Sequence, residues 1–348
     1  MTNLKNENIS FAVLGCGFIG KRHAEMIYRK NEAELIALCD IKPIEELNIS
    51  QYKVPFFKSF EEMLDSGLNF DVVNVCTPNG LHAEHTLMAL EHNKHVVCEK
   101  PMTISKSSAE EVLYKALQFS KNVFVVKQNR YSPPSIWLKE IIDKKILGKI
   151  FMVEMNCFWN RDERYYKKDG WKGTNSMDGG TLYTQFSHFI DIMYWLFGDI
   201  KNIQARFSDF NHHSLTEFED SGFVTFDFIH GGMGCFNYST SVWNSNMESS
   251  ITVIGETGSV KVGGQYMEKV EFCHIKDYIM PELPPVNPAN DYGGYKGSAS
   301  NHHYVIDNVV DTLKERTTMT TNALEGLKVV DIIEKIYTLR DKKIFSKK

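Results

Sequence analysis

Two short segments of the sequence contain side chains that could move a proton. The segment CEKPM, residues 98–102, places Lys100 between Glu99 and a proline. A later segment, SHFIDIMYWLFGD, contains His188 and Asp191, which are three residues apart and share one face of a helix. Histidine accepts a proton near neutral pH without help, whereas lysine does so only where burial or a neighbouring cation lowers its pKa. Both segments are candidates for acid–base chemistry.

Each segment also has an ordinary interpretation. A lysine beside a glutamate is common on solvated surfaces, and a lone helical histidine is more often a core residue. The acid one turn from His188 favours a role in a site, as does the Gly-Gly pair before it, which permits close backbone approach to a ligand. A metal site is disfavoured because His188 and Asp191 have no obvious third ligand. The catalytic interpretation therefore depends on the elements that position these residues.

Short apolar runs alternate with helical patterns over about the first 130 residues. Runs of this length are typical of strands buried on both faces of a parallel sheet. The alternation predicts a doubly wound α/β sheet, with ligands beyond the carboxyl ends of the strands. Lys100 follows one of these runs and so would lie on that edge. The runs cover residues 10–14, 34–40, 71–78, 95–101 and 123–131.

A glycine-rich turn, GCGFIG, follows the first run and opens a helix. Its first glycine allows a tight turn, its second lets the backbone approach a pyrophosphate, and its third permits close helix–strand packing. Asp40 ends the next strand and could bind both ribose hydroxyls, which favours NAD over NADP; a turn cap is the alternative. The predicted cofactor residues here are Gly15, Gly17, Phe18, Ile19, Gly20 and Asp40.

The segment CTPNGLH, residues 76–82, ends another strand on the same edge. Its polar groups could face the nicotinamide half of the cofactor, and its proline would stiffen the turn. His82 could instead be an ordinary residue at a helix start. The cofactor-binding residues predicted here are Thr77, Pro78, Asn79 and His82, and we add Gln128 from the last predicted strand.

The pattern changes after residue 130. One helix is followed by several alternating runs, which predict an α+β domain with an open, largely antiparallel sheet. We expect an NAD-binding domain over residues 1–130 and a substrate-binding and oligomerisation domain over 131–348, whose last helix could pack back on the first domain. An aromatic-rich sheet face could be buried in a homodimer or homotetramer, or by helices of the same chain.

Bulk composition restricts the partners. The formal net charge is −5, from 39 Lys and Arg against 44 Asp and Glu, and the sequence contains no basic block. Nucleic acid and anionic membranes are therefore not expected to bind. The seven cysteines form no CxxC pair, and no apolar run approaches the ~20 residues that span a bilayer. We expect a cytoplasmic protein that acts on a small molecule.

The stretches GCGFIGKRHA, VCTPNGLHAEHTLMAL and CEKPM, in this order and spacing, resemble the Gfo/Idh/MocA oxidoreductase family. The resemblance covers the nucleotide-binding half. It implies NAD as cofactor and Lys100 as the catalytic lysine. It also implies that Glu99 contacts the cofactor ribose and that Pro101 shapes a cis-proline-type turn.

The resemblance continues in DGGTLYTQFSHFIDIMYWLFGD, residues 178–199, with a glycine pair before a His-x-x-Asp segment. It implies that His188 is the catalytic histidine and that Asp191 contacts the substrate. Most members carry an acid four residues before the histidine, where this chain has Thr184. The chain therefore departs from the family pattern at this position.

Three further features resemble a subgroup that oxidises the 3-hydroxyl of UDP-N-acetylglucosaminuronic acid. They are Gln185, the segment RDERYYKKDGWKGT (161–174), and GSASNHHYVIDNVVDTL (297–313), whose His-His pair lies near the sugar nucleotide in that subgroup. The cations of residues 161–174 could meet a carboxylate or diphosphate, and the aromatic rings could stack on a sugar or uracil. A solvated loop of mixed charge is the alternative. The substrate-binding candidates implied are Arg161, Arg164, Tyr166, Trp171, Gln185, Asp191 and His302, with Lys100 and His188.

Oxidation of a secondary alcohol removes a hydride and a proton, so the site needs a base. We expect Lys100 to hold the hydroxyl and His188 to take the proton, although the reverse assignment is open. Thr184 would hydrogen-bond the sugar or His188. A dehydrogenase of a free sugar or polyol such as inositol is one alternative, and a catalytically inactive NAD-binding regulator is another.

Overall fold

The computed structural model describes residues 7–345, with side chains described up to residue 341, and this chain forms two compact units. The first unit contains the residues up to Lys127 together with His302–Val330. The second contains Gln128–Asn301 and the chain from Asp331 onward. The observed division after Lys127 lies close to the expected boundary at residue 130, and the segment 302–330 returns to the first unit.

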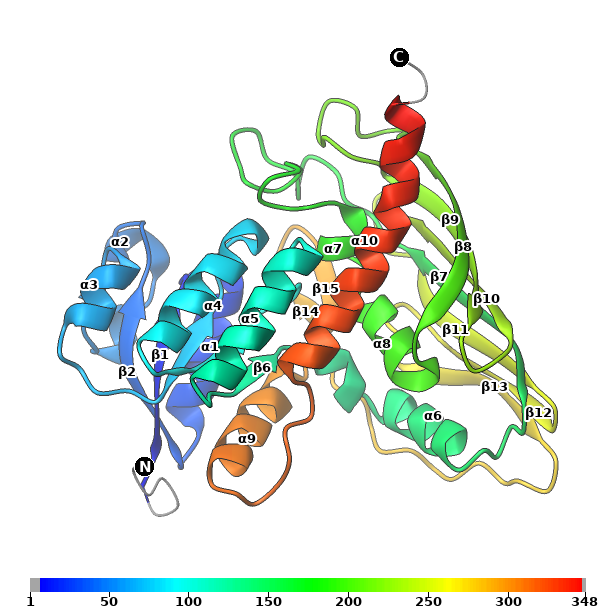
Figure 1. The fold of residues 1–348 in the computed structure, drawn as a ribbon, viewed down its shortest axis with the longest axis horizontal. Coiled ribbons are helices and arrows are strands. Elements are labelled where there is room, and N and C mark those ends of the chain that lie inside the picture. The colour runs from blue at the N-terminus through cyan, green and yellow to red at the C-terminus, as the bar shows by residue number, and fades with distance from the viewer. Residues whose placement is uncertain (1–6, 346–348) are drawn as a thin grey trace. The chain divides into compact units, whose positions relative to one another are not determined.

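The first unit is built on a six-stranded parallel sheet, of which Figure 1 labels β1, β2 and β6. The strand order is β3-β2-β1-β4-β5-β6. Its strands are β1 (Ile9–Leu14), β2 (Ala33–Cys39), β3 (Phe56–Phe57), β4 (Val72–Val75), β5 (His95–Cys98) and β6 (Val123–Val125). Its helices are α1 (Phe18–Arg29), α2 (Ile44–Leu47), α3 (Phe60–Asp65), α4 (His82–Glu91), α5 (Lys106–Gln118) and α9 (His302–Leu313), with short 3₁₀ turns at Ser50–Tyr52 and Asn79–Leu81. The doubly wound parallel sheet expected from the apolar runs is confirmed.

The central strands are buried on both faces. Every residue of β4 and of β6 is buried, as continuous apolar runs require. The sheet order reverses direction at β1 and β4, which lie side by side. In such sheets ligands bind at the carboxyl edge of this switch point. Three candidate segments leave the sheet at that edge. They are the glycine-rich turn after β1, the 76–82 turn after β4 and Glu99–Pro101 after β5.

The second unit is built on a seven-stranded mixed sheet in the order β13-β12-β11-β7-β10-β9-β8. Only β7 and β10 are parallel neighbours; the other pairs are antiparallel. The strands are β7 (Ile150–Phe158), β8 (Ile200–Ser208), β9 (Ser221–Phe228), β10 (Met233–Ser239), β11 (Glu248–Gly255), β12 (Gly258–Gly263) and β13 (Lys269–Ile275), and β14 (Ala289–Asp291) pairs separately with β15 (Lys296–Ala299). The expected open, largely antiparallel sheet is confirmed.

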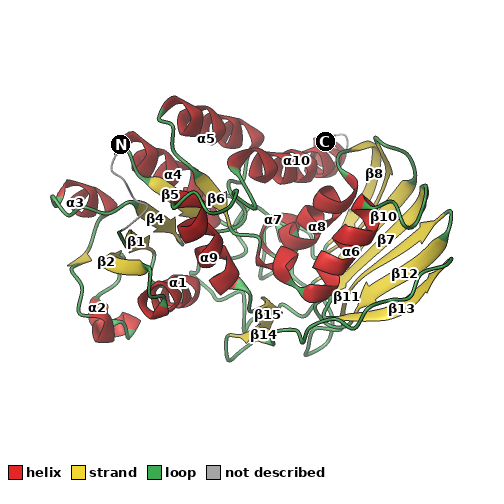
Figure 2. Cartoon of the chain, turned by 90° about the horizontal axis from the view of Figure 1, so that it is seen from below, coloured by secondary structure: helices red, strands yellow, loops and turns green. Residues whose placement is uncertain are grey.

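Helices cover one face of the seven-stranded sheet. Figure 2 shows α6 (Pro133–Asp143) and α8 (Ser187–Phe197) on that face, and a 3₁₀ turn at Gln128–Tyr131 precedes α6. The short α7 (Thr181–Thr184) leads into α8, and α10 (Ala323–Phe345) begins in the first unit and ends in the second. Alternate residues of β9 and β10, including Phe226, Phe236 and Tyr238, are buried under these helices. Among the described residues, no helix is long and apolar enough to cross a membrane.

Candidate active site

The glycine-rich turn has the geometry that a dinucleotide requires. Gly15 has φ of +86°, and a Cβ there would lie 2.7 Å from the carbonyl oxygen of Cys76. A Cβ at Gly17 would have nothing within 4 Å, so the backbone beside it is open. Gly17 is also the N-cap of α1, whose first turn has no side-chain cap. The turn therefore offers open space and helix N–H groups to an anion, as a pyrophosphate site does.

Asp40 stabilises this turn from the end of β2. Its Oδ2 accepts a hydrogen bond from the backbone N–H of Cys16 at 2.6 Å, and its Oδ1 accepts from the N–H of Lys42 at 2.9 Å. The turn-cap role considered as an alternative is thus present in the structure. Each carboxylate oxygen has a second lone pair, so a contact with ribose hydroxyls stays a prediction.

Glu99 lies in a buried polar cluster of the first unit, next to half-buried Lys100. The amide of Asn74 donates to Nδ1 of His23 at 2.8 Å, so the proton of that ring is on Nε2, which donates to Glu99 at 2.9 Å. Nε2 of His302 lies 3.8 Å from the same carboxylate. The other Glu99 oxygen accepts from the N–H of Lys100 at 3.2 Å. Glu99 is thus fixed from several sides directly before Lys100.

The protonation states of this cluster follow from burial and hydrogen bonding. Burial acts to raise the pKa of Glu99, but the hydrogen bond from His23 and electrostatic interactions with His23, His302 and Lys100 outweigh it and hold that pKa at about 2. Burial lowers the pKa of His302 to about 3, so its ring is neutral at physiological pH. The peptide bond between Lys100 and Pro101 is cis, as the resemblance implied.

The turn after β4 is held by histidines. His82 is buried, and its two ring nitrogens lie 2.7 Å from the carbonyl oxygen of Pro101 and 2.8 Å from that of Thr77. The ring therefore links the 76–82 turn to the cis-proline turn. The Thr77 hydroxyl contacts Nδ1 of His85 at 2.9 Å. Asn79 is buried in the 3₁₀ turn between them. Contacts of these residues with a nicotinamide stay predictions.

In the second unit, His188 belongs to a buried polar group on α8. Nε2 of Gln128 lies 3.3 Å from Nε2 of His188 and 3.3 Å from the Ser298 hydroxyl. Because an amide nitrogen can only donate, Nε2 of His188 is the unprotonated nitrogen in this contact. Thr184 donates to the carboxylate of buried Asp178, whose other oxygen accepts from the N–H of Gly173 at 2.8 Å. A carboxylate thus lies beside the position where the family resemblance led us to expect an acid.

Asp191 forms a buried ion pair with Arg130. The Nε and Nη2 atoms of Arg130 donate to the two carboxylate oxygens of Asp191 at 2.8 and 2.7 Å, and both side chains are about 1% exposed. The guanidinium also lies 5.3 Å from the ring centroid of Trp195. This pair ties the 3₁₀ turn at Gln128–Tyr131 to α8. Any substrate contact of Asp191, which stays a prediction, would use its remaining lone pairs.

Arg161 and Arg164 differ sharply although they are three residues apart. Arg161 is buried, and its guanidinium lies among the rings of Trp159, Tyr165 and Tyr295. Arg164 is exposed and pairs with Asp162 at 2.7 Å. Only Arg161 thus holds its charge away from solvent.

The two aromatic candidates of this segment are also unlike one another. Tyr166 is buried and packs edge-to-face against Tyr165, Phe218 and His212, whereas Trp171 is half-buried. Tyr166 therefore belongs to an aromatic core cluster, and stacking of either ring on a ligand stays a prediction.

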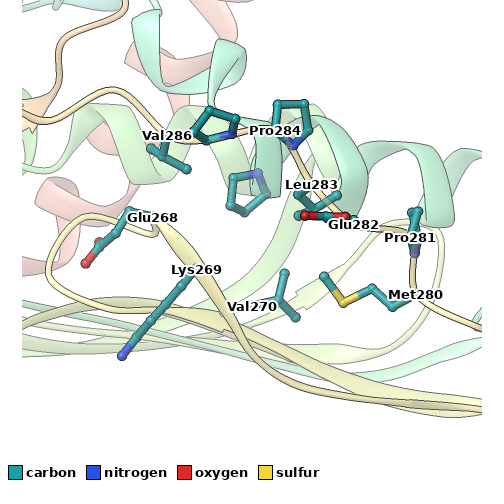
Figure 3. Close-up of a pocket in the computed structure, with 11 residues that line it drawn as sticks. Glu268, Lys269, Val270, Met280, Pro281, Glu282, Leu283, Pro284 and Val286 are labelled. Atoms are coloured by element: carbon teal, nitrogen blue, oxygen red, sulfur yellow. The ribbon is translucent and has the colours of Figure 1, made fainter.

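A surface groove of about 410 Å³ lies elsewhere in the second unit. Figure 3 shows it between the proline-rich segment 280–286 and the stretch Glu268–Val270, with Pro134 also lining it. None of the residues predicted to bind cofactor or substrate lines it. The groove therefore does not coincide with the candidate site.

Two family models match the chain. An oxidoreductase family model described as an NAD-binding Rossmann fold matches residues 9–127, and the Gfo/Idh/MocA C-terminal domain model matches residues 136–261. The WlbA dehydrogenase from Bordetella pertussis is 30% identical, with coverage of 97% of this chain and 98% of that one and a TM-score of 0.85. The chain belongs to the Gfo/Idh/MocA oxidoreductase family. It is therefore an NAD-dependent oxidoreductase of a family that includes sugar dehydrogenases.

Several similar proteins are named as sugar dehydrogenases or form complexes with a nucleotide sugar. The WlbA dehydrogenase from Chromobacterium violaceum is 31% identical, covers 98% of this chain and 96% of its own, and has a TM-score of 0.87. Both WlbA structures are complexes with NADH and UDP-GlcNAcA. The D-glucoside 3-dehydrogenase of Escherichia coli is 28% identical over 64% of this chain and 67% of its own. The glucose-6-phosphate 3-dehydrogenase of Bacillus subtilis is 26% identical over 82% and 84%.

Several residues that build the site were not among those predicted from the sequence. His23 and Arg130 anchor Glu99 and Asp191, and Asp178 accepts from Thr184. His23 follows the glycine-rich turn in the quoted stretch GCGFIGKRHA, and Asp178 opens the Gly-Gly stretch, so both were visible without an assigned role. Arg130 had no local signal, because its partner lies 61 residues away.

Proposed function

We propose that this protein oxidises the C3 hydroxyl of a UDP-N-acetylhexosaminuronic acid by hydride transfer to NAD. The observation that carries the proposal is the likeness, over nearly the whole chain, to two WlbA dehydrogenases in complex with NADH and UDP-GlcNAcA. A buried, unneutralised Arg161 in the second unit supports an anionic substrate. The acid at which the family resemblance pointed is replaced by Thr184 beside Asp178, so the substrate assignment needs its own test.

The residues of the first unit fit the cofactor. The open backbone at Gly17 and the uncapped start of α1 suit a pyrophosphate, and Asp40 stands at the end of β2 where ribose hydroxyls are bound. When bound, NAD supplies a hydride acceptor at its nicotinamide ring. Glu99, held in its ionised form by His23, fixes the backbone of Lys100 through its N–H.

The proposed proton chemistry uses Lys100 and His188. Lys100 binds the reacting hydroxyl and stabilises the negative charge that develops on its oxygen, and His188 accepts the proton. Nε2 of His188 is suited to this because it is the unprotonated nitrogen in its contact with Gln128. That contact is long, at 3.3 Å, so a substrate hydroxyl can replace it. Thr184, oriented by Asp178, would contact the sugar or His188. In the alternative assignment, Lys100 accepts the proton and His188 binds the hydroxyl.

A second candidate is a 3-dehydrogenase of a free or phosphorylated sugar. It is favoured by the likeness to D-glucoside 3-dehydrogenase and glucose-6-phosphate 3-dehydrogenase. The two candidates differ in whether a nucleotide and a carboxylate are needed for binding. A panel of UDP-hexuronic acids, glucosides, glucose 6-phosphate and inositols, followed by the absorbance of reduced nicotinamide, separates them. Turnover of UDP-hexuronic acids supports the proposal, and turnover of free or phosphorylated sugars alone excludes it.

We also propose that the protein forms a homodimer or homotetramer through the uncovered face of the seven-stranded sheet. Figure 2 shows α6 and α8 on the opposite face. Large apolar side chains stand on the uncovered face, and Phe223, Met233 and Phe272 are more than half exposed. Phe223→Glu should therefore lower the mass measured by light scattering. An unchanged mass, or a monomeric wild type, would refute this assembly.

A further inference from the structure

Arg161 is a buried cation whose hydrogen-bond partners are all neutral. Its side chain is 2% exposed, and no ion pair joins it to an acid in the part of the chain with described side chains. Its Nε donates to Oε1 of Gln185 at 2.7 Å. Its Nη1 donates to the carbonyl of Asn160 at 2.6 Å and to Oδ1 of Asn246 at 3.2 Å, and its Nη2 donates to the carbonyl of Lys296 at 3.2 Å. Four of its five N–H groups are therefore used within the protein.

Burying such a charge without a counter-ion is costly. Three aromatic rings reduce the cost, since the centroids of Trp159, Tyr165 and Tyr295 lie 4.8, 5.1 and 5.2 Å from the guanidinium carbon. Burial nevertheless lowers the pKa of Arg161. An anion bound close by would offset the remaining cost. Only one N–H group of Arg161 is left for the direct contact with an anionic substrate that the sequence led us to expect.

The contact with Arg161 fixes the orientation of Gln185. A guanidinium cannot accept a hydrogen bond, so the oxygen of the Gln185 amide must face it and the NH₂ group must point away. Gln185 is 4% exposed, and its Nε2 has no hydrogen-bond partner among the described residues. Its backbone N–H is held by the carbonyl of Thr181 at 3.0 Å. The chain thus holds a buried donor in place and leaves it unused.

Gln185 stands in the segment that the proposed function assigns to the sugar. It directly follows Thr184 and precedes His188 by three residues. The strand β15 contacts both Arg161 and the surroundings of His188. The carbonyl of Lys296 accepts from Arg161, and the hydroxyl of Ser298 contacts Gln128, which in turn contacts His188. The unused donor and the predicted base therefore belong to one buried polar group in the second unit.

We propose that Arg161 is a positioning residue that acts through Gln185. It turns the Gln185 NH₂ group towards the substrate, and its uncompensated charge makes that donor select a carboxylate over a neutral hydroxymethyl group. The inference rests on the proposed function, because it takes the ligand to be the carboxylate of a nucleotide-linked sugar acid. It assigns the discrimination between sugar acid and neutral sugar to Gln185 and not to a direct guanidinium–carboxylate pair.

The variant Gln185→Glu tests this with effects of opposite sign. The new carboxylate would pair with Arg161, so the melting temperature should rise. The same change removes the donor and repels an anion, so kcat/KM for UDP-GlcNAcA should fall by about 10- to 100-fold, the loss expected for a hydrogen bond to a charged group. Turnover of UDP-GlcNAc should fall less, which lowers the ratio of the two kcat/KM values, and the Kd for NADH should stay within about twofold of wild type.

The near-isosteric variant Gln185→Met is the matched control. It removes the donor without adding charge and leaves Arg161 with one acceptor fewer, so both the melting temperature and kcat/KM for UDP-GlcNAcA should fall. The inference is overturned if Gln185→Glu keeps the wild-type ratio between kcat/KM for UDP-GlcNAcA and kcat/KM for UDP-GlcNAc. It is also overturned if Gln185→Glu loses both stability and activity, as Gln185→Met does. If wild-type protein turns over no UDP-hexuronic acid, the proposed function itself fails, and the inference fails with it.

Discussion

Replacing Tyr337 by phenylalanine tests how the structure holds the segment that carries His188. The Tyr337 hydroxyl donates to Oε1 of buried Glu219 at 2.8 Å and accepts from the N–H of Leu182, in the first turn of α7, at 2.8 Å. Glu219 also accepts from Arg340 at 2.8 Å. The hydroxyl thus links this buried acid to the first turn of α7, which begins three residues after Asp178.

The magnitude follows from the bonds that are lost. A hydrogen bond to a charged group contributes roughly 1.5–3 kcal/mol and a neutral one about 1 kcal/mol. Tyr337→Phe removes one of each and should lower the free energy of unfolding by about 3 kcal/mol. Tyr238 is a matched control, since its hydroxyl donates to the same Glu219 oxygen at 2.9 Å but does not contact α7. Tyr238→Phe should lower the free energy of unfolding by about 2 kcal/mol.

Urea unfolding of the two variants, with steady-state kinetics on the best substrate of the panel, measures both effects. Only Tyr337→Phe should lower kcat, because only it releases the backbone before Thr184 and His188. KM for NAD should be unchanged in both variants. Equal effects of the two substitutions on kcat, or no loss of stability in Tyr337→Phe, would refute the view that this hydroxyl positions the α7–α8 segment.

Three further predictions concern the first unit. Lys100→Met should lower kcat by at least ~10³ while NADH still binds, and near-normal turnover would remove Lys100 from the chemical step. Gly15→Ala should weaken NADH binding and lower stability, because its Cβ would lie 2.7 Å from the carbonyl oxygen of Cys76 at a φ of +86°; unchanged fluorescence titrations of NADH would contradict this. Burial lowers the pKa of His95 from 6.5 to about 4, so the stability that its neutral ring preserves is present above pH 6.5 and is lost as the pH falls towards 4. The difference of about 2.5 between the two pKa values corresponds to about 3 kcal/mol of folding free energy. The melting temperature of His95→Gln should therefore depend less on pH over this range than that of wild type, and an equal pH dependence of the two melting temperatures would contradict the assignment.

Much of the fold could be predicted because it follows from local patterns. The central strands of the first sheet are continuous apolar runs, and the glycine-rich turn between β1 and α1 stands where the sequence places it. In the second sheet, β8 and β13 were not predicted. Both are edge strands with one buried residue each, and the apolar–polar alternation of β8 is confined to residues 203–208, so the signal that marks a half-buried strand is short. The run 123–131 also proved to be two elements, β6 and a 3₁₀ turn.

The site was less predictable because side-chain pairing is not a local property. Arg161 and Arg164 look equivalent in RDERYYKKDGWKGT, yet one is buried among rings and the other is paired at the surface. Tyr166 looks like a stacking residue but packs in an aromatic cluster. The bond between Tyr337 and Glu219 joins residues 118 apart in the chain, so no spacing rule could have revealed it.

The most direct test of the central claim is a single-turnover experiment with UDP-GlcNAcA that carries deuterium at C3. Purified protein in excess is mixed with NAD and this substrate, and the nicotinamide is analysed by mass spectrometry. The account predicts that one deuterium appears on the reduced nicotinamide and that its transfer shows a primary isotope effect. In Lys100→Met, no transfer of deuterium should be detected on the time scale of the wild-type reaction. Reduced nicotinamide without deuterium, or no reduction by this substrate while a free sugar reduces NAD, would contradict the account.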